Sequence, residues 1–204
     1  MERAKRVIDV AVAGVALALT SPLQGLVAIM VRRDVGAPVL FRQVRPGLHG
    51  EPFELLKFRT MRAVDRERGL VDDVDRLTPL GRRLRSTSLD ELPTLWNVLR
   101  GDMSLVGPRP LLVEYLTLYS PEQQHRHDVR PGLTGLAQVS GRNSIGWDER
   151  LRLDLQYVRK HSLRGDLRII LRTIGAVLRR EGITAEGDAT MPRFQGSGGE
   201  RGAA

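Results

Sequence analysis

Two neighbouring carboxylates, Asp90 and Glu91, stand in the stretch STSLDELPTLWN (86–97) of a chain that is otherwise rich in arginine. The spacing of Ser88 and Glu91 matches a capping box, so both acids could serve only to begin a helix. Pro93 weakens this interpretation, because it would remove a backbone hydrogen bond inside that helix. A helix that begins at Asp90 fits better. Adjacent helical side chains diverge by ~100°, so one carboxylate would attack or stand poised while the other binds a hard cation.

Two loops further along the chain could bind an anion. Arg109 stands between two prolines, whose restricted φ angles would hold its guanidinium in one place. Such an arginine suits a pair of phosphate oxygens, although G-P-R-P is also a common rigid turn. The stretch RPGLTGLAQVSGRN (130–143) is dense in glycine and carries Gln138 and Arg142. Its glycines permit close approach of the backbone to a ligand, and ordinary turns explain them equally well.

The composition favours an anionic partner. The 204 residues include 32 Lys plus Arg and 24 Asp plus Glu, so the net charge is +8. Nucleic acid, acidic lipid and phosphorylated substrates are the partners that such a charge attracts. Cysteine is absent, which excludes disulfides, thiolate nucleophiles and zinc–thiolate sites. Aromatic residues make up only 4%, so we do not expect stacking on nucleic-acid bases to be a main theme.

The N-terminal region points to a membrane. Residues 10–31 form an uncharged segment of 22 residues, which as a straight helix would just cross a ~30 Å hydrocarbon layer. Ser21 and Pro22 stand near its middle, where proline removes a backbone donor and should bend the helix. Basic residues flank both ends, and the positive-inside rule draws both ends to the cytoplasm. We therefore expect a Pro-kinked, re-entrant helix; a spanning helix and a cleaved signal peptide are the alternatives.

The rest of the chain has the pattern of a small mixed α/β domain that is mostly helical. Residues 38–61 contain two apolar runs around a glycine-bearing turn, which predicts a β-hairpin. The charged stretch 62–76 predicts a solvated loop. Thr78 and Pro79 fit the N-cap and first residue of a helix that ends near Ser86.

Two helical patterns follow, at 147–161 and at 163–180. The second has Leu167 and Leu171 on an apolar face and arginines elsewhere, so it could lie on an anionic bilayer or pack with a solvated basic face. No periodic apolar pattern remains after residue 183. The chain is therefore expected to comprise a membrane anchor (1–33), a main domain (34–183) and a disordered tail (184–204).

Several motifs occur in a characteristic order: KRVIDV, FRQVRPG, KFRTM, RSTSLDELPTLWNVLRGDMSLVGPRP, RPGLTGLAQVSGRN and LDLQYVRKHSLRGDLRIILRT. Together, over residues 5–183, they resemble the bacterial sugar transferase family and its small monotopic phosphoglycosyl transferases. The resemblance implies that domain 34–183 transfers sugar-1-phosphate from a UDP-sugar to a polyprenol phosphate, such as undecaprenyl phosphate, and releases UMP. It also implies the cytoplasmic face of the bacterial plasma membrane, where glycans such as exopolysaccharide, O-antigen or those of glycoproteins are begun.

The resemblance assigns roles to individual residues. Asp90 would be the nucleophile that forms an aspartyl phosphosugar, and Glu91 would bind a Mg²⁺ ion beside it. The other implied site residues are polar or basic: Lys57, Arg85 and Arg109 for phosphate, Asp166 as a further active-site residue, and Gln138 and Arg142 for the nucleotide.

Other functions stay open at this point. A basic, membrane-anchored scaffold without catalysis would use Asp90 and Glu91 only as helix caps. A nucleic-acid binder would have an affinity that falls steeply with salt, and the apolar N-terminal segment disfavours it. We expect a UDP-sugar, undecaprenyl phosphate, Mg²⁺ and an anionic bilayer as partners, and no nucleic acid. The sequence leaves open the sugar that is transferred and whether the protein forms a homodimer.

Overall fold

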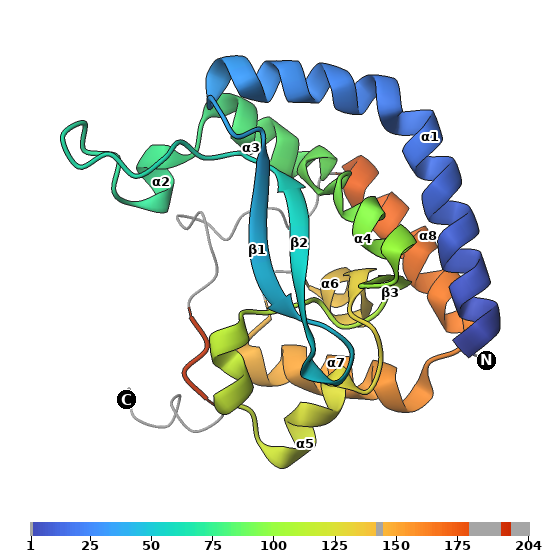
Figure 1. Ribbon diagram of the computed structural model, residues 1–204. Helices are drawn as coiled ribbons and strands as arrows, with labels where there is room; N and C mark the ends of the chain where they lie inside the picture. Colours follow the sequence, from blue (N-terminus) through green and yellow to red (C-terminus); the bar gives the residue numbers. More distant parts are fainter. Residues whose placement is uncertain (1, 142–144, 180–192, 197–204) are drawn as a thin grey trace.

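A computed structural model describes residues 2–141, 145–179 and 193–196 as a mostly helical α/β fold (Figure 1). The helices and strands are α1 (Glu2–Asp34), β1 (Leu40–Pro46), β2 (Pro52–Phe58), α2 (Asp73–Arg76), α3 (Pro79–Ser86), α4 (Thr94–Arg100), β3 (Ser104–Val106), α5 (Pro121–Gln124), β4 (Gly132–Thr134), α6 (Leu136–Ser140), α7 (Trp147–Lys160) and α8 (Leu163–Arg179). Short 3₁₀ turns are η1 (Leu48–Gly50), η2 (Leu89–Glu91), η3 (Val113–Thr117) and η4 (His125–His127). The predicted mixed, mostly helical class is confirmed.

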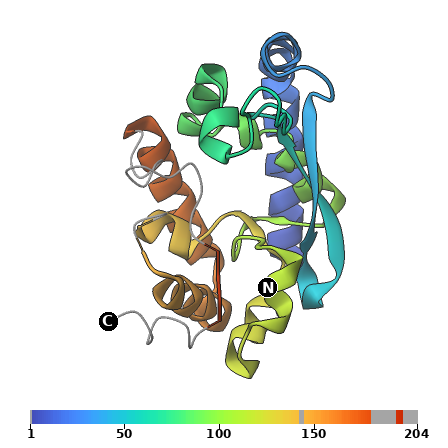
Figure 2. The same ribbon diagram turned by 90° about the vertical axis from the view of Figure 1, so that its left-hand side faces the viewer.

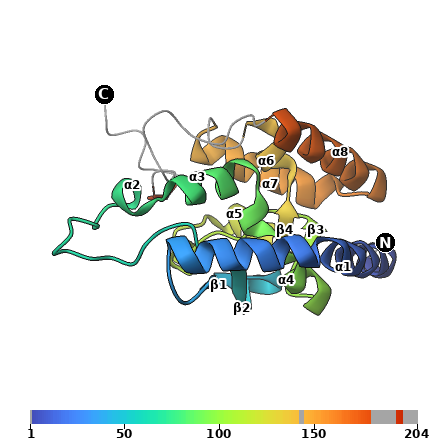
Figure 3. The same cartoon turned by 90° about the horizontal axis from the view of Figure 1, so that it is seen from above.

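Helix α1 runs without interruption through Pro22. Because proline has no N–H, the carbonyl of Ala18 lacks its usual helical donor; the Ser21 hydroxyl donates to that oxygen at 2.9 Å instead. The two halves of α1 run in different directions, as the views from the front and from above show (Figures 1 and 3). Within the described residues, α1 is the one helix long and apolar enough to cross a membrane, by length and composition alone.

Helix α1 also packs on the rest of the fold. Ala13 belongs to the main core, and Val27 and Val31 lie in a second cluster with Phe58. Near the N-terminus, the Arg6 guanidinium donates to the carbonyls of the last turn of α4 at 2.6 and 2.8 Å. The expected boundary at residue 33 therefore does not coincide with a break in packing.

The predicted β-hairpin is confirmed. Strands β1 and β2 pair antiparallel from Leu40 opposite Phe58 to Pro46 opposite Pro52, and the turn η1 joins them. The hairpin and α8 lie on opposite sides of the molecule (Figure 2). The pairing places Lys57 near the end of β2.

A second, parallel sheet forms from β3 and β4, which the sequence did not predict. The stretch 130–143 was expected to be a loop open to a ligand, but it contains β4 and α6. Gly132 explains the difference, because a Cβ at this position would lie 2.0 Å from the backbone nitrogen of Gly107. This glycine lets two backbone segments of the fold approach each other, a role that the sequence did not predict.

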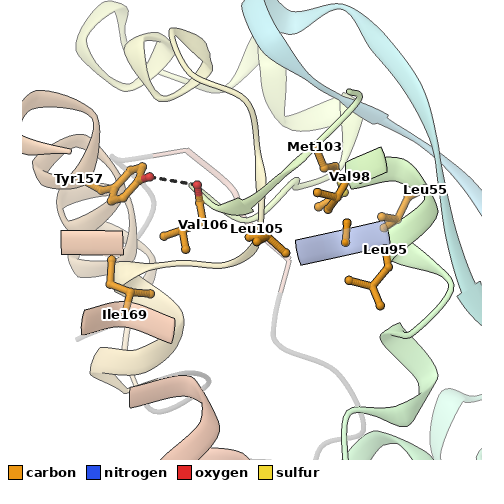
Figure 4. Packing of buried hydrophobic residues seen from close by; sticks show 9 residues of the cluster. Leu55, Leu95, Val98, Met103, Leu105, Val106, Tyr157 and Ile169 are labelled. Carbon is orange, nitrogen blue, oxygen red and sulfur yellow. Dashed lines mark hydrogen bonds between the residues drawn. The ribbon is translucent and has the colours of Figure 1, made fainter. Parts of the chain in front are cut away.

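The main hydrophobic core lies between α4, β3 and the C-terminal helices (Figure 4). Val98 and Val106 are almost completely buried, and Ile169 reaches them from α8. Full burial of such side chains contributes about 1.5–3 kcal/mol each. The Tyr157 hydroxyl oxygen on α7 lies within hydrogen-bonding distance of the Val106 carbonyl, at 2.9 Å (Figure 4), so the core also fixes the end of β3.

The predicted helices at Thr78–Ser86 and in the last third of the chain are confirmed as α3, α7 and α8. Thr78 caps α3 by accepting a hydrogen bond from the Gly81 nitrogen at 2.9 Å. On α8 the apolar residues Leu167 and Leu171 face outward, and 61% of Leu171 is exposed. Asp166 and Ile169 face the protein instead.

The charged stretch 62–76 differs from expectation, whereas the C-terminal tail is described only in part. The stretch 62–76, expected to be a solvated loop, contains α2 and a bridge between Asp65 and Leu70. Of the tail expected to be disordered (184–204), the structure describes residues 193–196. Phe194 is buried there, with its ring 5.6 Å from Tyr115 and 5.3 Å from Trp147. Phe194 therefore packs on the domain, whereas residues 184–192 and 197–204 lie outside the described residues.

Candidate active site

Asp90 and Glu91 lie in the tight turn η2, which joins α3 to α4. Ser88 adopts a left-handed conformation (φ 56°, ψ 17°) and its side chain makes no capping hydrogen bond. The following α-helix begins only at Thr94, with Pro93 as its N-cap residue. The expectation of a helix from Asp90 was therefore wrong, because Pro93 begins the helix instead of interrupting it. The capping box does not form either.

The Glu91 carboxylate holds together three segments that are distant in sequence. Its Oε1 atom accepts a hydrogen bond from Lys57 Nζ at 2.6 Å and another from Arg109 Nη2 at 2.9 Å. Lys57 comes from β2, and Arg109 follows β3. The Lys57 and Glu91 side chains are mostly buried, so their ion pair is shielded from water and salt, whereas 36% of the Arg109 side chain is exposed.

The two neighbouring carboxylates have opposite electrostatic environments. Burial, and then the negative charge of Glu91, raise the pKa of Asp90 to about 6, although nearby cationic groups oppose this. Burial also raises the pKa of Glu91, but Lys57 and Arg109 outweigh it and hold that pKa well below the ordinary range. Two neighbouring carboxylates with very different pKa values are typical of active sites in which each has a separate chemical role.

Arg85 completes the cationic surroundings of Asp90. Its Nε atom donates to the Thr60 hydroxyl at 3.0 Å, and its positive charge lowers the pKa of Asp90. Gly81 makes this placement possible, because a Cβ there would lie 2.0 Å from the carbonyl oxygen of Thr60. Helix α3 can therefore pack directly against the chain that leaves the hairpin.

The main chain around Arg109 is fixed by hydrogen bonds to three successive carbonyls. The Pro108 oxygen accepts from the Gly132 nitrogen at 2.9 Å. The Arg109 oxygen accepts from Arg126 at 2.7 Å, and the Pro110 oxygen lies 3.4 Å from Arg45 Nη1. The G-P-R-P segment therefore has a fixed main chain, as the predicted rigid turn requires. It also positions the Arg109 guanidinium, which donates to Glu91.

A Mg²⁺ ion fits the donor chemistry of this site only together with a substrate. Within the described residues, no group of three or more His, Cys, Asp and Glu side chains could hold a metal. Mg²⁺ in enzymes that act on phosphates commonly uses one or two carboxylates and completes its shell with phosphate oxygens and water. Asp90 and Glu91 match this donor set, and both hydrogen bonds from Lys57 and Arg109 reach Oε1 of Glu91.

A family model described as "Bacterial sugar transferase" matches residues 1–180. The chain belongs to the bacterial sugar transferase family. The resemblance noted in the sequence is thereby confirmed, and the protein is an enzyme of the transferase class.

Three relatives of this sugar transferase illustrate the similarity. It is 50% identical to "Uncharacterized sugar transferase EpsL" of Bacillus subtilis, over 95% of this chain and 96% of the relative. It is 47% identical to "UDP-glucose:undecaprenyl-phosphate glucose-1-phosphate transferase" of Caulobacter vibrioides, over 85% and 69%. It is 42% identical to "Exopolysaccharide production protein ExoY" of Rhizobium meliloti, over 85% of each chain.

The structure brings together five of the predicted site residues of this sugar transferase: Asp90, Glu91, Lys57, Arg85 and Arg109. Asp166 has other contacts. It binds Lys5 of α1 at 2.5 Å and accepts from the Tyr157 hydroxyl at 2.8 Å.

The two residues predicted to serve the nucleotide have different outcomes. Gln138 lies on α6 and donates from its side-chain nitrogen to the Leu133 carbonyl at 3.1 Å. Its Oε1 atom is buried and has no hydrogen-bond partner among the described residues. Arg142 lies outside the described residues. Nucleotide binding by both residues stays a prediction.

Sequence reasoning missed the buried ion pair of Arg126 with Asp154, whose Nη2 and Oδ2 atoms are 2.7 Å apart. A signal for it was present. Asp154 falls among the apolar residues Leu151 and Leu155, on the face of α7 that becomes buried. A carboxylate on a buried helix face requires a cationic partner, but the sequence did not identify Arg126 as that partner.

Proposed function

We propose that this protein transfers sugar-1-phosphate from a UDP-sugar to polyprenyl phosphate, in particular undecaprenyl phosphate, and releases UMP. The observation that carries the proposal is the pairing of a buried Asp90, with a pKa raised to about 6, and a Glu91 that is ion-paired to Lys57 and Arg109. The name of the Caulobacter relative, which specifies this class of reaction, supports it.

In the first half-reaction, an ionised oxygen of Asp90 attacks the phosphorus that carries the sugar. The bond from this phosphorus to the bridging oxygen of the diphosphate breaks, and its electron pair leaves with UMP. Lys57, Arg85 and Arg109 supply positive charge near the attacking carboxylate, which reduces the repulsion between two anions. The product is an aspartyl phosphosugar on Asp90.

In the second half-reaction, a phosphate oxygen of the polyprenyl phosphate attacks the same phosphorus. The acyl phosphate bond to Asp90 breaks and regenerates the carboxylate, and the sugar leaves on a polyprenyl diphosphate. Glu91 would hold Mg²⁺, which when bound would neutralise charge on the diphosphate oxygens. Asp90 makes the attack because two cations hold the pKa of Glu91 low and reduce the nucleophilicity of its carboxylate.

We place the reaction at the cytoplasmic face of the bacterial plasma membrane. The apolar surface of α1 and the outward-facing Leu167 and Leu171 of α8 support contact with a bilayer. Anionic lipids would attract the net charge of +8. A re-entrant path for α1 would leave both of its basic ends on the cytoplasmic side, where a soluble UDP-sugar can meet a lipid phosphate.

A UMP-release assay tests the proposed function. The full chain in nanodiscs is given Mg²⁺, undecaprenyl phosphate and each member of a panel of UDP-sugars. We expect multiple turnovers with at least one donor and a polyprenyl diphosphate sugar in the lipid fraction. UMP release without a lipid-linked product would indicate hydrolysis, and no release from any donor would favour a non-catalytic scaffold.

A further inference from the structure

One edge of β2 is free of strand pairing and faces helix α4. Strand β2 pairs only with β1, and α4 packs beside it (Figure 1). Along an antiparallel pair, the backbone groups of successive residues point alternately toward the partner strand and away from it. The nitrogen of Arg59 donates to the Val39 carbonyl at 2.9 Å. In this register Leu56 and Glu54 direct their backbone groups away from β1.

Thr94 and Asn97 of α4 bind these backbone groups in place of a third strand. The Thr94 hydroxyl donates to the Leu56 carbonyl at 2.7 Å. The Asn97 amide accepts from the Leu56 nitrogen at 3.0 Å and donates to the Glu54 carbonyl at 2.7 Å. Thr94 and Asn97 are only 1% and 0% exposed, so without these side chains the backbone groups of β2 would be buried and unpaired.

The two polar residues lie on the same face of α4, because they are three positions apart in the helix. Leu95 and Val98 supply the contact of α4 with the main core. Hydrogen bonds are directional, whereas apolar contacts are not. Thr94 and Asn97 therefore determine where along α4 the strand lies, which the apolar contacts alone would leave free.

The strand that is held in this way carries one of the two cations of Glu91. Lys57 directly follows Leu56, and its Nζ atom donates to Glu91 Oε1 at 2.6 Å. Glu91 in turn precedes Thr94 by three residues. The hydroxyl bond and the ion pair therefore join the same two segments side by side. A shift of β2 along α4 would move the Lys57 ammonium away from Glu91.

Asn97 also contacts the segment that leads to the second cation. Its side-chain nitrogen lies 3.1 Å from Asp102 Oδ2, and its carbonyl accepts from the Met103 nitrogen at 3.2 Å. Met103 is the residue before β3, and the chain after β3 presents Arg109 to Glu91. A single buried asparagine thus connects the two segments that supply the cations of Glu91.

We propose, on the basis of the proposed function, that Thr94 and Asn97 are positioning residues of the transfer reaction. They fix β2 and the start of β3 against α4, and so determine where Lys57 meets Glu91. Both side chains are buried, so they act through Lys57 and not on the substrate. A cation that is fixed before the donor binds stabilises phosphate charge without reorganising, and a misplacement of about 1 Å can cost about a hundredfold in rate.

The test measures the burst of UMP by rapid quench. The full chain in nanodiscs is given Mg²⁺ and a UDP-sugar, without polyprenyl phosphate. Thr94→Val keeps the shape of the side chain but removes the donor, and we expect it to slow the burst about tenfold. Thr94→Ser retains the hydroxyl and should retain the wild-type rate. The matched control is Thr117→Val, because the Thr117 hydroxyl donates to the Glu114 carbonyl at 3.2 Å on the exposed turn η3.

A double-mutant cycle with Lys57 separates positioning from a general loss of structure. Lys57→Met should itself slow the burst, because it removes the group that is positioned. Adding Thr94→Val to Lys57→Met should then cause no further loss. A purely structural role of Thr94 would instead slow the burst by the same factor with and without Lys57.

A wild-type burst rate in Thr94→Val would overturn the proposal, as would equal losses in the two backgrounds. If Thr94→Val lowers the melting temperature by several degrees, the cycle is repeated with Thr94→Ala and with Asn97→Asp, well below their melting temperatures. Equal losses with and without Lys57 in these cycles would also overturn the proposal. Failure of the proposed function is distinguishable, because the wild type would then give no burst with any UDP-sugar.

Discussion

Arg126 fixes the main chain of Arg109. Its Nη2 atom donates both to the Arg109 carbonyl and to Asp154 Oδ2, each at 2.7 Å. The Arg126 and Asp154 side chains are 2% and 3% exposed. The Arg109 guanidinium donates to Glu91. The buried Arg126–Asp154 ion pair therefore helps to position the Asp90–Glu91 site by fixing the backbone of Arg109.

We expect Arg126→Met to lower the free energy of unfolding by about 3–5 kcal/mol, because the buried carboxylate of Asp154 would lose its partner. Arg159→Met is the matched control. Arg159 is bound to Glu122 at 2.6 Å, but 64% of its side chain is exposed, and such pairs contribute about 0–1 kcal/mol. Denaturant unfolding of both variants in the same detergent measures the difference. Equal losses would contradict a special role for the buried pair.

Asp90 is predicted to carry the covalent intermediate. With a UDP-sugar and Mg²⁺ but no polyprenyl phosphate, the enzyme should release about one UMP per active site and gain the mass of one sugar phosphate. Asp90→Asn should abolish both, because an amide is a far poorer nucleophile, whereas Glu91→Gln should slow the reaction and weaken its dependence on Mg²⁺. Intact-protein and peptide mass spectrometry of quenched reactions locates the adduct. An adduct on Glu91 would reverse the assignment.

The pH dependence of the first half-reaction should follow the ionisation of Asp90. Its carboxylate attacks only when deprotonated, and its pKa is raised to about 6 in the folded protein. The value of kcat/KM for the donor, which reports groups of the free enzyme, should therefore rise with pH and level off above about pH 7. Glu91 stays ionised throughout, because its pKa is held low. A profile that is flat between pH 5 and 8 would contradict the role of Asp90.

The same ionisation should reduce the stability of the folded protein. Burial raises the pKa of Asp90 from 3.8 to about 6, so the folded state binds a proton more tightly than the unfolded state. The protonated Asp90 carboxyl therefore contributes to the stability of the folded state below pH 4, and this contribution is lost as the pH rises through about 6. Asp90→Asn should therefore have a higher melting temperature than the wild type at pH 7.5, with the gain shrinking toward pH 4. A gain that does not vary with pH would rule out this cause.

If α1 is re-entrant, as proposed, both of its ends face the cytoplasm. Single cysteines in place of Glu2 and Asp34 can be introduced without interference, since the chain has no cysteine of its own. A membrane-impermeant thiol reagent applied to intact cells should label neither position, and both should react once the cells are opened. Labelling of the Glu2 position in intact cells, with Asp34 protected, would establish a spanning helix instead.

Local sequence patterns predicted the elements whose residues are close in the chain. The hairpin turn, the cap at Thr78 and the periodicity of α7 and α8 each depend on contacts over a few residues, and the structure confirms them. The start of α4 was misplaced because Pro93 can either interrupt a helix or begin one. Its sequence neighbours do not distinguish the two.

Local sequence patterns did not predict the contacts between segments that are distant in the chain. Lys57 and Arg109 are 34 and 18 residues from Glu91, and only the family resemblance suggested that they belong together. The parallel pairing of β3 with β4 depends on a close backbone approach at Gly132, which resembles an ordinary turn glycine in the sequence. The burial of Phe194 depends on three aromatic rings from other segments, so its own neighbours gave no sign of it.

The pairing of Lys5 with Asp166 makes the membrane helix a structural part of the enzyme. Asp166 also accepts from the Tyr157 hydroxyl, whose oxygen lies 2.9 Å from the carbonyl oxygen of Val106, three residues before Arg109. A shortened chain without residues 1–8 would leave the buried Asp166 carboxylate without its ammonium partner, at the base of the loop that presents Arg109. Removal of the N-terminal turns, a common route to a soluble protein, would therefore damage the site itself. We therefore expect a chain that lacks these turns to lose activity even where it gains solubility.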